Sequence, residues 1–292
     1  MMFLLLKALK EYLLNFLLRR IKTTGNLKLM KIKIPPYPNF KISEQAFDND
    51  VESNSVITKD SNVLSNQLIM VAKFPSGEKR VIKARPVRYQ NKLFVTAFPN
   101  PVHLFLSTAI EQFNLSEKFK QENFIKCGKK IGDDIYILTI EENGTHDCYN
   151  HYIKNRASSI IMLVSALEAY LNHIIPNNFI YSAIRKEKIV EFDKTDIESS
   201  KLSFKEKLID VLPRAINEVD FWTKILKERS ILLELYNTRK EIIHLKTNSQ
   251  DDFDRYFTAI DKMLDLDISS AIETTINFMN LASDNFIEKA DQ

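Results

Sequence analysis

The sequence contains few of the residues on which several common functional sites depend. Only two of its 292 residues are cysteines, Cys127 and Cys148, which excludes a disulfide framework and a thiolate zinc site and indicates a reducing, cytoplasmic compartment. The five glycines form neither a G-x-G-x-x-G nor a G-x-x-x-x-G-K-[ST] pattern. A G-x-S-x-G elbow and an H-E-x-x-H helix are also absent from the sequence. We therefore expect neither a dinucleotide oxidoreductase nor a nucleotide-driven motor.

The sequence also lacks a large charge of one sign. Its 41 Lys and Arg residues against 38 Asp and Glu give a formal net charge of +3, which by itself indicates no partner. Residues 1–144 hold 22 basic and 14 acidic residues (+8), whereas residues 145–292 hold 19 and 24 (−5). The near-neutral total is thus the sum of two halves of opposite charge.

A long apolar run is missing as well, even from the apolar N-terminus. Lys7, Lys10 and Glu11 interrupt the first twenty residues, so the longest unbroken apolar run there is six residues. A membrane-spanning helix needs about 20 mostly apolar residues and a secretory signal about 7 to 15, so we expect no stable membrane insertion. Residues 1–29 are interpreted as an apolar and basic helical extension. It is either an upstream extension or a partner-docking helix, with an interfacial membrane helix as the less favoured alternative.

Residues 30–142 carry the β character of the chain and are predicted to form a small mixed, β-rich domain. Turn signals separate three β-branched and aromatic runs, which predict a strand meander at 66–74, 79–89 and 92–98. A helix at about 103–124 and a strand within 133–142 are expected to follow. The basic residues on or near the middle run are RNA-binding candidates, because a row of cations can follow phosphates: Lys79, Arg80, Lys83, Arg85 and Arg88. The same row also fits a solvated face or a charged edge strand.

Residues 145–292 are predicted to be entirely helical. The expected helices cover 149–175, 179–190, 203–212, 221–246, 251–266 and 268–287. Pro176 and Pro213 are expected to end two of them, and Ser203 is a good N-cap for a third. The predicted fold class is therefore α+β: a mixed β-rich domain followed by an all-α antiparallel bundle.

The first long helix of this bundle is apolar on nearly every side, apart from one polar face. Ser165, Glu168 and Asn172 follow steps of three and four and therefore share that face. The face is either a narrow solvent stripe or the lining of a polar cleft.

A second predicted helix carries a cation at an apolar position. Steps of four, three and four place one arginine on the apolar stripe of this helix. The stripe consists of Leu232, Tyr236, Arg239 and Ile243. Because burial of an unpaired guanidinium is costly, we expect a nearby anion, which is Glu168, Glu241 or a ligand phosphate. His244 follows five residues after Arg239. Histidine moves protons near neutral pH and arginine holds phosphate oxygens, so the pair suits phosphodiester chemistry, although an ion-pair arginine and a surface or core histidine are the alternative.

The segment 236–244, YNTRKEIIH, resembles the R-x4-6-H motif of the HEPN superfamily, small helical-bundle domains of many prokaryotic toxins and antiviral systems. The upstream segment 165–172, SALEAYLN, is similar to the first long helix of these bundles. The resemblance covers about residues 145–290 and implies a metal-independent endoribonuclease without a cofactor. It also implies a homodimer that joins two motifs across one cleft, with RNA as substrate and an antitoxin or regulatory protein as a further partner.

The resemblance also assigns roles to the residues of the motif. Arg239 would bind and polarise the scissile phosphate, and His244 would act as general acid or base. Attack by the ribose 2′-OH would then leave a 2′,3′-cyclic phosphate. Glu168, Tyr236 and Lys240 are expected at the cleft, although many active members carry a small polar residue where this chain has Lys240. The same superfamily includes non-catalytic members that bind nucleotides or proteins, and this is the alternative function.

Overall fold

The computed structural model describes eight segments of the chain, and the predicted helix at 1–29 lies outside them. These segments are 32–33, 68–73, 79–97, 99–119, 128–138, 145–244, 250–283 and 286–289. Contacts divide the chain into one unit of residues 1–33 and 289–292 and a second unit of residues 34–288. Strand β1 (Ile32–Lys33) pairs with β9 (Glu288–Lys289).

The three predicted strands of the meander are present. They are β2 (Leu68–Lys73), β3 (Lys79–Tyr89) and β4 (Lys92–Ala97), which pair antiparallel in the order β2-β3-β4. Gln90 and Asn91 join β3 to β4 with positive φ angles of 47° and 61°. A two-residue turn with this backbone matches the natural twist of an antiparallel hairpin, so the turn fixes the register of the pair.

Helix α3 (Pro101–Lys118) follows the sheet and ends earlier than the sequence predicts. The Asn100 side chain accepts hydrogen bonds from the backbone N–H groups of Val102 and His103, at 2.9 and 3.3 Å. Pro101 occupies the first turn, where a missing N–H has no cost. The strand predicted within 133–142 is β6 (Ile135–Ile137), which pairs with β5 (Lys129–Gly132).

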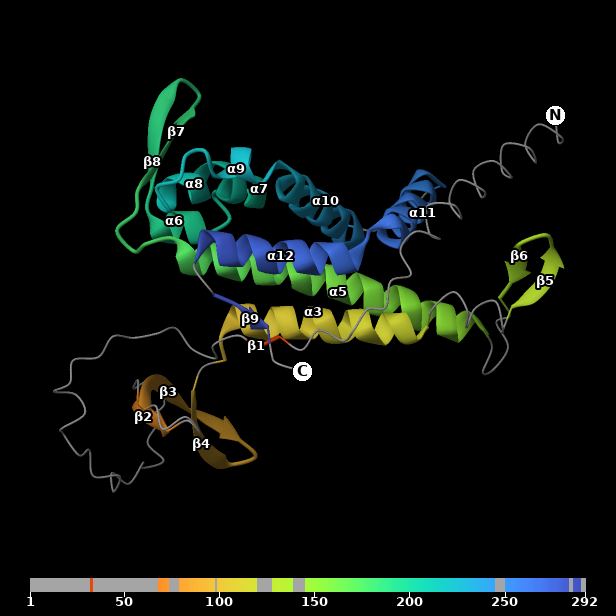
Figure 1. The fold of residues 1–292 in the computed structure, drawn as a ribbon, viewed down its shortest axis with the longest axis horizontal. Helices are drawn as coiled ribbons and strands as arrows, with labels where there is room; N and C mark the ends of the chain where they lie inside the picture. The colour runs from red at the N-terminus through yellow and green to blue at the C-terminus, as the bar shows by residue number, and fades with distance from the viewer. Residues whose placement is uncertain are drawn as a thin grey trace. The chain divides into compact units, whose positions relative to one another are not determined.

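Helix α5 (Thr145–Ile174) is the central helix of the described bundle. It packs against α3 and, on its other sides, against three later helices: α10 (Leu226–Ile243), α11 (Gln250–Asp265) and α12 (Ile268–Ala282) (Figure 1). By length and composition α5 could cross a membrane. However, Ile160, Leu163 and Leu167 on it are completely buried, which is typical of the core helix of a globular domain.

The prediction of a helix at 179–190, and of an all-helical second half, is wrong. This region is a hairpin of β7 (Tyr181–Arg185) and β8 (Lys188–Phe192), joined by Lys186 and Glu187 with positive φ angles of 46° and 65°. Alternate residues of both strands face the protein core, which favours period two over the helical period.

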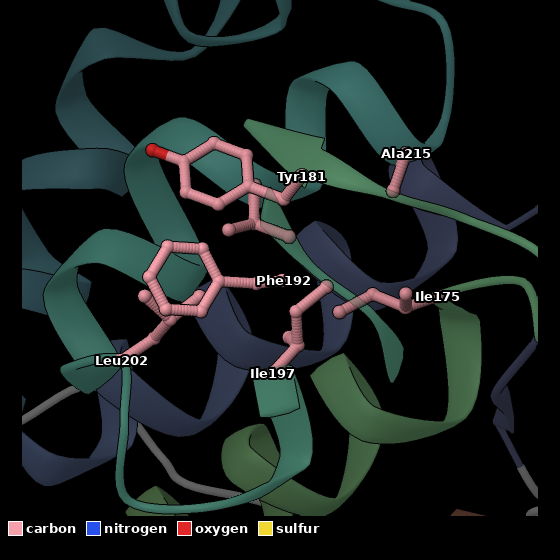
Figure 2. Close-up of a cluster of buried hydrophobic side chains, with 7 residues drawn as sticks. Ile175, Tyr181, Phe192, Ile197, Leu202 and Ala215 are labelled. Atoms are coloured by element: carbon pink, nitrogen blue, oxygen red, sulfur yellow. The ribbon is translucent and has the colours of Figure 1, made fainter. Parts of the chain in front are cut away.

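The buried ends of the hairpin explain why this segment forms strands. Tyr181 and Phe192 are register partners, and their rings pack against Ile175 and Ile197 (Figure 2). The cluster is completed by Leu202, which lies in the bend before Ser203, and by the helical residues Val211 and Ala215. The hairpin therefore closes one end of the bundle by burying one of its faces, while Ile184 on its opposite face stays 75% exposed.

Helix α6 (Lys194–Glu198) directly follows the hairpin. The helical stretch after α6 continues through Pro213, where the sequence predicts its end. It consists of α7 (Phe204–Glu206), the π-helical turn η3 (Lys207–Val211) and α8 (Leu212–Ala215). Proline has no N–H and its ring would clash with the carbonyl group four residues earlier, and the wider π turn directly before Pro213 relieves that conflict. Ser203 caps this helix as predicted, because its Oγ accepts a hydrogen bond from the N–H of Glu206 at 3.2 Å.

The helix predicted at 221–246 is divided in two. Ile225 has φ −135° and ψ 52°, and it separates α9 (Phe221–Lys224) from α10. Trp222 on α9 anchors the break, because its indole N–H donates to the Leu208 carbonyl oxygen at 3.1 Å and its ring stacks on Phe278 of α12. The described chain thus belongs to the α+β class, with a predominantly helical body and antiparallel strand pairs.

Candidate functional site

The motif helix α10 contacts the core along a different line from the predicted stripe. Its buried residues are Leu232, Leu235 and Thr238, whereas Ile243 is 43% exposed. Arg239 is half-buried and lies beside this line, at the border between the core and solvent. The sequence prediction therefore shifted the apolar face of α10 by about one residue.

Tyr236 is one turn before Arg239 and does not stand free in a cleft. Its ring stacks on Phe204 of α7, with the ring centroids 4.6 Å apart and the planes 18° apart. This contact packs α10 against the helix that begins at Ser203. Tyr236 therefore has a packing role on the same side of α10 as the predicted site.

The Arg239 guanidinium carries a charge that the described chain does not neutralise through an ion pair. Its Nε atom is buried and has no hydrogen-bond partner, and among the described residues no carboxylate forms an ion pair with this side chain. Glu241, one of the anions expected from the sequence, pairs with Lys262 of α11 at 2.6 Å. A buried guanidinium nitrogen without a partner is costly, and within the described chain no group offsets that cost at Arg239.

Glu168, the second expected anion, lies close to a different cation. Burial lowers the pKa of Lys207 on η3, and the nearby negative charges of Glu168 and Glu198 oppose that shift. The Lys207 amino group also donates to the Ser199 carbonyl oxygen at 3.1 Å. Sequence reasoning missed Lys207, because no local signal distinguishes it from the neighbouring lysines, and only the packing of η3 brings it near α5.

The polar face of α5 is half-buried along its length. Ser165 donates its hydroxyl to the Ile161 carbonyl oxygen at 2.9 Å, and Glu168 and Asn172 are both partly covered. The Oδ1 atom of Asn172 is buried without a hydrogen-bond partner in the described chain. This face is therefore neither a freely solvated stripe nor a core surface, and it lies on a helix that packs against α10.

His244 and Lys240 are exposed near the C-terminus of α10. The His244 backbone N–H donates to the Lys240 and Glu241 carbonyl oxygens, at 3.3 and 3.2 Å, and so closes the helix. Each helical residue turns the chain by about 100°, so a residue five positions later lies about 140° further around the helix axis. Arg239 and His244 therefore project from different sides of α10. Within one chain the two residues do not converge on one point.

The five basic residues predicted on the sheet do not form one row. In β3, Lys79, Lys83 and Arg85 occupy odd register positions, whereas Arg80 and Arg88 occupy even ones, and successive residues of a strand belong to opposite faces. Arg88 is exposed. Any polyanion that follows one face of the sheet therefore meets only part of the predicted set.

The histidines around Cys148 have local partners. The His151 ring stacks on Phe119 with centroids 5.6 Å apart, and the His146 ring nitrogen is 3.0 Å from the Asn150 amide. Within the described segments, no group of three His, Cys, Asp or Glu side chains is arranged to hold a metal ion.

Comparison with known proteins found no matching family model, no matching curated protein and no matching solved structure. The function is therefore inferred from the residues and contacts of this chain.

Proposed function

We propose that the protein is a metal-independent endoribonuclease of the HEPN type, acting as a growth-arresting toxin or an anti-phage effector. The observation that carries the proposal is the half-buried Arg239, whose Nε atom has no partner on the helix that ends at the exposed His244. A phosphate is an anion of the size and charge that a guanidinium binds in two-point fashion.

The chemistry follows from the properties of the two side chains. His244 removes the proton of the ribose 2′-OH, and the resulting oxygen attacks the neighbouring phosphorus. Arg239 stabilises the negative charge that builds on the non-bridging oxygens. The P–O5′ bond breaks and the proton that His244 took up is returned to the 5′-oxygen, which leaves a 2′,3′-cyclic phosphate, a free 5′-OH and a neutral His244.

A homodimer would reconcile this chemistry with the positions of the two residues. Arg239 and His244 project from different sides of one helix, whereas an exposed His244 is free to approach the Arg239 of a second copy. Lys240, which directly follows Arg239 in the sequence, is exposed and adds positive charge that attracts the RNA backbone. The proposed site is thus shared between two chains.

The proposed function is tested with wild type and His244→Ala, compared for growth arrest on expression and for RNA cleavage in EDTA. Loss of a general acid–base group should lower cleavage by about a hundredfold or more and relieve the growth arrest. His103→Ala, which removes a half-buried histidine of α3, serves as the matched control and should behave like wild type. Equal toxicity and equal cleavage by wild type and His244→Ala would refute the nuclease.

A non-catalytic module that binds nucleotides or proteins is the second candidate function. The net charge of −5 over residues 145–292 favours it, because an acidic bundle is a poor platform for RNA. Binding of a nucleotide that His244→Ala leaves unchanged, together with absence of RNA cleavage by wild type, would support this alternative.

A further inference from the structure

One face of the β2-β3-β4 sheet exposes two aromatic rings. In β3 the even positions include Ala84, which is completely buried, and Pro86, which is also buried. The odd positions include Val87 and Tyr89, which are 47% and 63% exposed. One face of β3 is therefore covered at Ala84 and Pro86, although Arg88 farther along it is exposed, and the opposite face is open at Val87 and Tyr89.

Strand β4 extends the open face. Phe94 is the register partner of Val87, and Lys92 is the register partner of Tyr89, so all four share one face of the pair. Phe94 is 49% exposed, and Lys92 is exposed. Tyr89 and Phe94 are diagonal neighbours, whose backbones lie about 7–8 Å apart in such a pair. We call these four residues, Val87, Tyr89, Lys92 and Phe94, the open face.

The strands around the open face are strongly basic. Residues 68–97 contain seven Lys or Arg residues and one acidic residue, Glu78, which lies between β2 and β3. By register, Lys79, Lys83 and Arg85 occupy the odd positions of β3, in line with Val87 and Tyr89. Along β3 the face of these residues thus carries three basic positions, interrupted by Val81, and no acidic one, which complements a polyanion.

Aromatic rings on a sheet among basic residues suit a polymer whose bases are unpaired. Bases of a single strand can stack on exposed side-chain rings while lysines and arginines hold the phosphates between them. A duplex keeps its bases in their own stack and offers these rings no flat surface. The Gln90 side-chain amide donates to the Tyr89 hydroxyl oxygen at 3.3 Å, which contacts the ring at its edge and leaves its faces open.

We infer that the open face binds single-stranded RNA, with Tyr89 and Phe94 stacking on bases and Lys92 holding a phosphate. This inference deepens the proposed function, because it names the substrate class and the surface that holds it. The choice of RNA over DNA rests on the proposed function, whereas the binding of an unpaired strand rests on the sheet itself. The basic N-terminal half would then hold the RNA that the acidic bundle cleaves.

The test uses the full chain with His244→Ala as background, so that cleavage does not consume the probe. A fluorescent, unstructured RNA of twelve nucleotides is titrated against this chain and against the same chain with Tyr89→Ala and Phe94→Ala. Each stacking ring should account for about a tenfold change in affinity, so the double substitution should weaken binding by about a hundredfold. Lys92→Gln should weaken binding and reduce its salt dependence by about one phosphate contact.

Two control substitutions remove an exposed ring and a lysine next to a turn at positions outside the open face. Phe257→Ala removes a ring of α11 that is 59% exposed. Lys188→Gln removes the exposed lysine that follows the Lys186–Glu187 turn, as Lys92 follows the Gln90–Asn91 turn. Both should leave the affinity unchanged.

Three results would overturn the inference: equal affinity after Tyr89→Ala and Phe94→Ala, tighter binding of the same sequence as a duplex, or binding of anionic phosphatidylserine vesicles without binding of the RNA. The two proposals fail separately. Cleavage that depends on His244 but not on Tyr89 and Phe94 would refute the open face alone. Binding that depends on the two rings in a chain that cleaves nothing would refute the nuclease alone.

Discussion

Arg156 and Arg239 lie on two helices that pack against each other, α5 and α10, yet the fold uses their charges differently. Arg156 is only 6% exposed, and its Nη2 atom lies 3.0 and 2.7 Å from the carbonyl oxygens of Met263 and Leu266. These carbonyls stand at the C-terminal end of α11, where helix carbonyls lack partners and the helix dipole favours a cation. Both arginines bury an Nε atom that has no acceptor, so the difference lies in the terminal nitrogens: no backbone carbonyl of the described segments accepts a hydrogen bond from Arg239.

Of the two arginines, only Arg156 makes hydrogen bonds that hold two helices together. Arg156 joins α5 to the end of α11, so its charge is part of the bundle's structure. Arg239 stands at the border of α10 and brings the fold no ion pair within the described segments. A charge that the fold does not use is expected to serve binding or catalysis, and substitutions of the two arginines distinguish these roles.

The largest effect is expected for Arg156→Ala. The substitution leaves the carbonyl oxygens at the end of α11 without a charged donor and should lower the free energy of unfolding by about 3 kcal/mol. Urea denaturation measures this change. Arg255→Ala, at an exposed position of α11, is the control and should stay within about 0.5 kcal/mol of wild type. A loss below about 1 kcal/mol for Arg156→Ala would contradict the structural role.

A smaller effect is expected for Arg239→Ala and for its coupling to Glu168. Because Arg239 is half-buried and has no ion pair in the described chain, its loss should change the free energy of unfolding by less than about 1 kcal/mol. A double-mutant cycle with Glu168→Gln should give a coupling energy below about 0.5 kcal/mol. A loss of several kcal/mol with strong coupling would show that the two side chains form a structural ion pair.

The smallest effect concerns Lys207, the cation that the structure places near Glu168. Burial lowers its pKa in the folded chain, so between that value and the ordinary lysine pKa the unfolded chain binds more protons than the folded chain. The free energy of unfolding should therefore increase slightly as the pH rises from the lowered pKa of Lys207 towards the ordinary lysine value. Lys207→Gln should remove this increase, and an unchanged slope would contradict the assignment.

Local signals in the sequence predicted the elements whose ends are determined locally. The cap at Ser203 and the three strands of the β2-β3-β4 sheet follow from side-chain chemistry and period-two patterns within a few residues. The hairpin at 181–192 was missed because its turn, Lys186–Glu187, contains neither glycine nor asparagine. Its strands are stabilised by burial of Tyr181 and Phe192 against distant helices, which a single segment does not reveal.

The candidate site was predictable in part for the same reason. Arg239 and His244 stand out in the sequence as polar residues on a long helix, and α10 is present. The phase of its buried face depends on contacts with α5 and α12, so the predicted stripe was displaced. Arg156 could not be assigned from sequence, because the carbonyl groups it contacts lie more than a hundred residues away.

The most direct test of the central claim, that Arg239 serves RNA rather than the fold, is the rate of RNA cleavage by Arg239→Ala in EDTA. With the unfolding midpoint in urea close to that of wild type, we expect cleavage to slow by about a hundredfold or more, since one donor to the transition-state charge is removed. The wild-type products should carry 2′,3′-cyclic phosphates. Cleavage by Arg239→Ala at the wild-type rate would contradict the account.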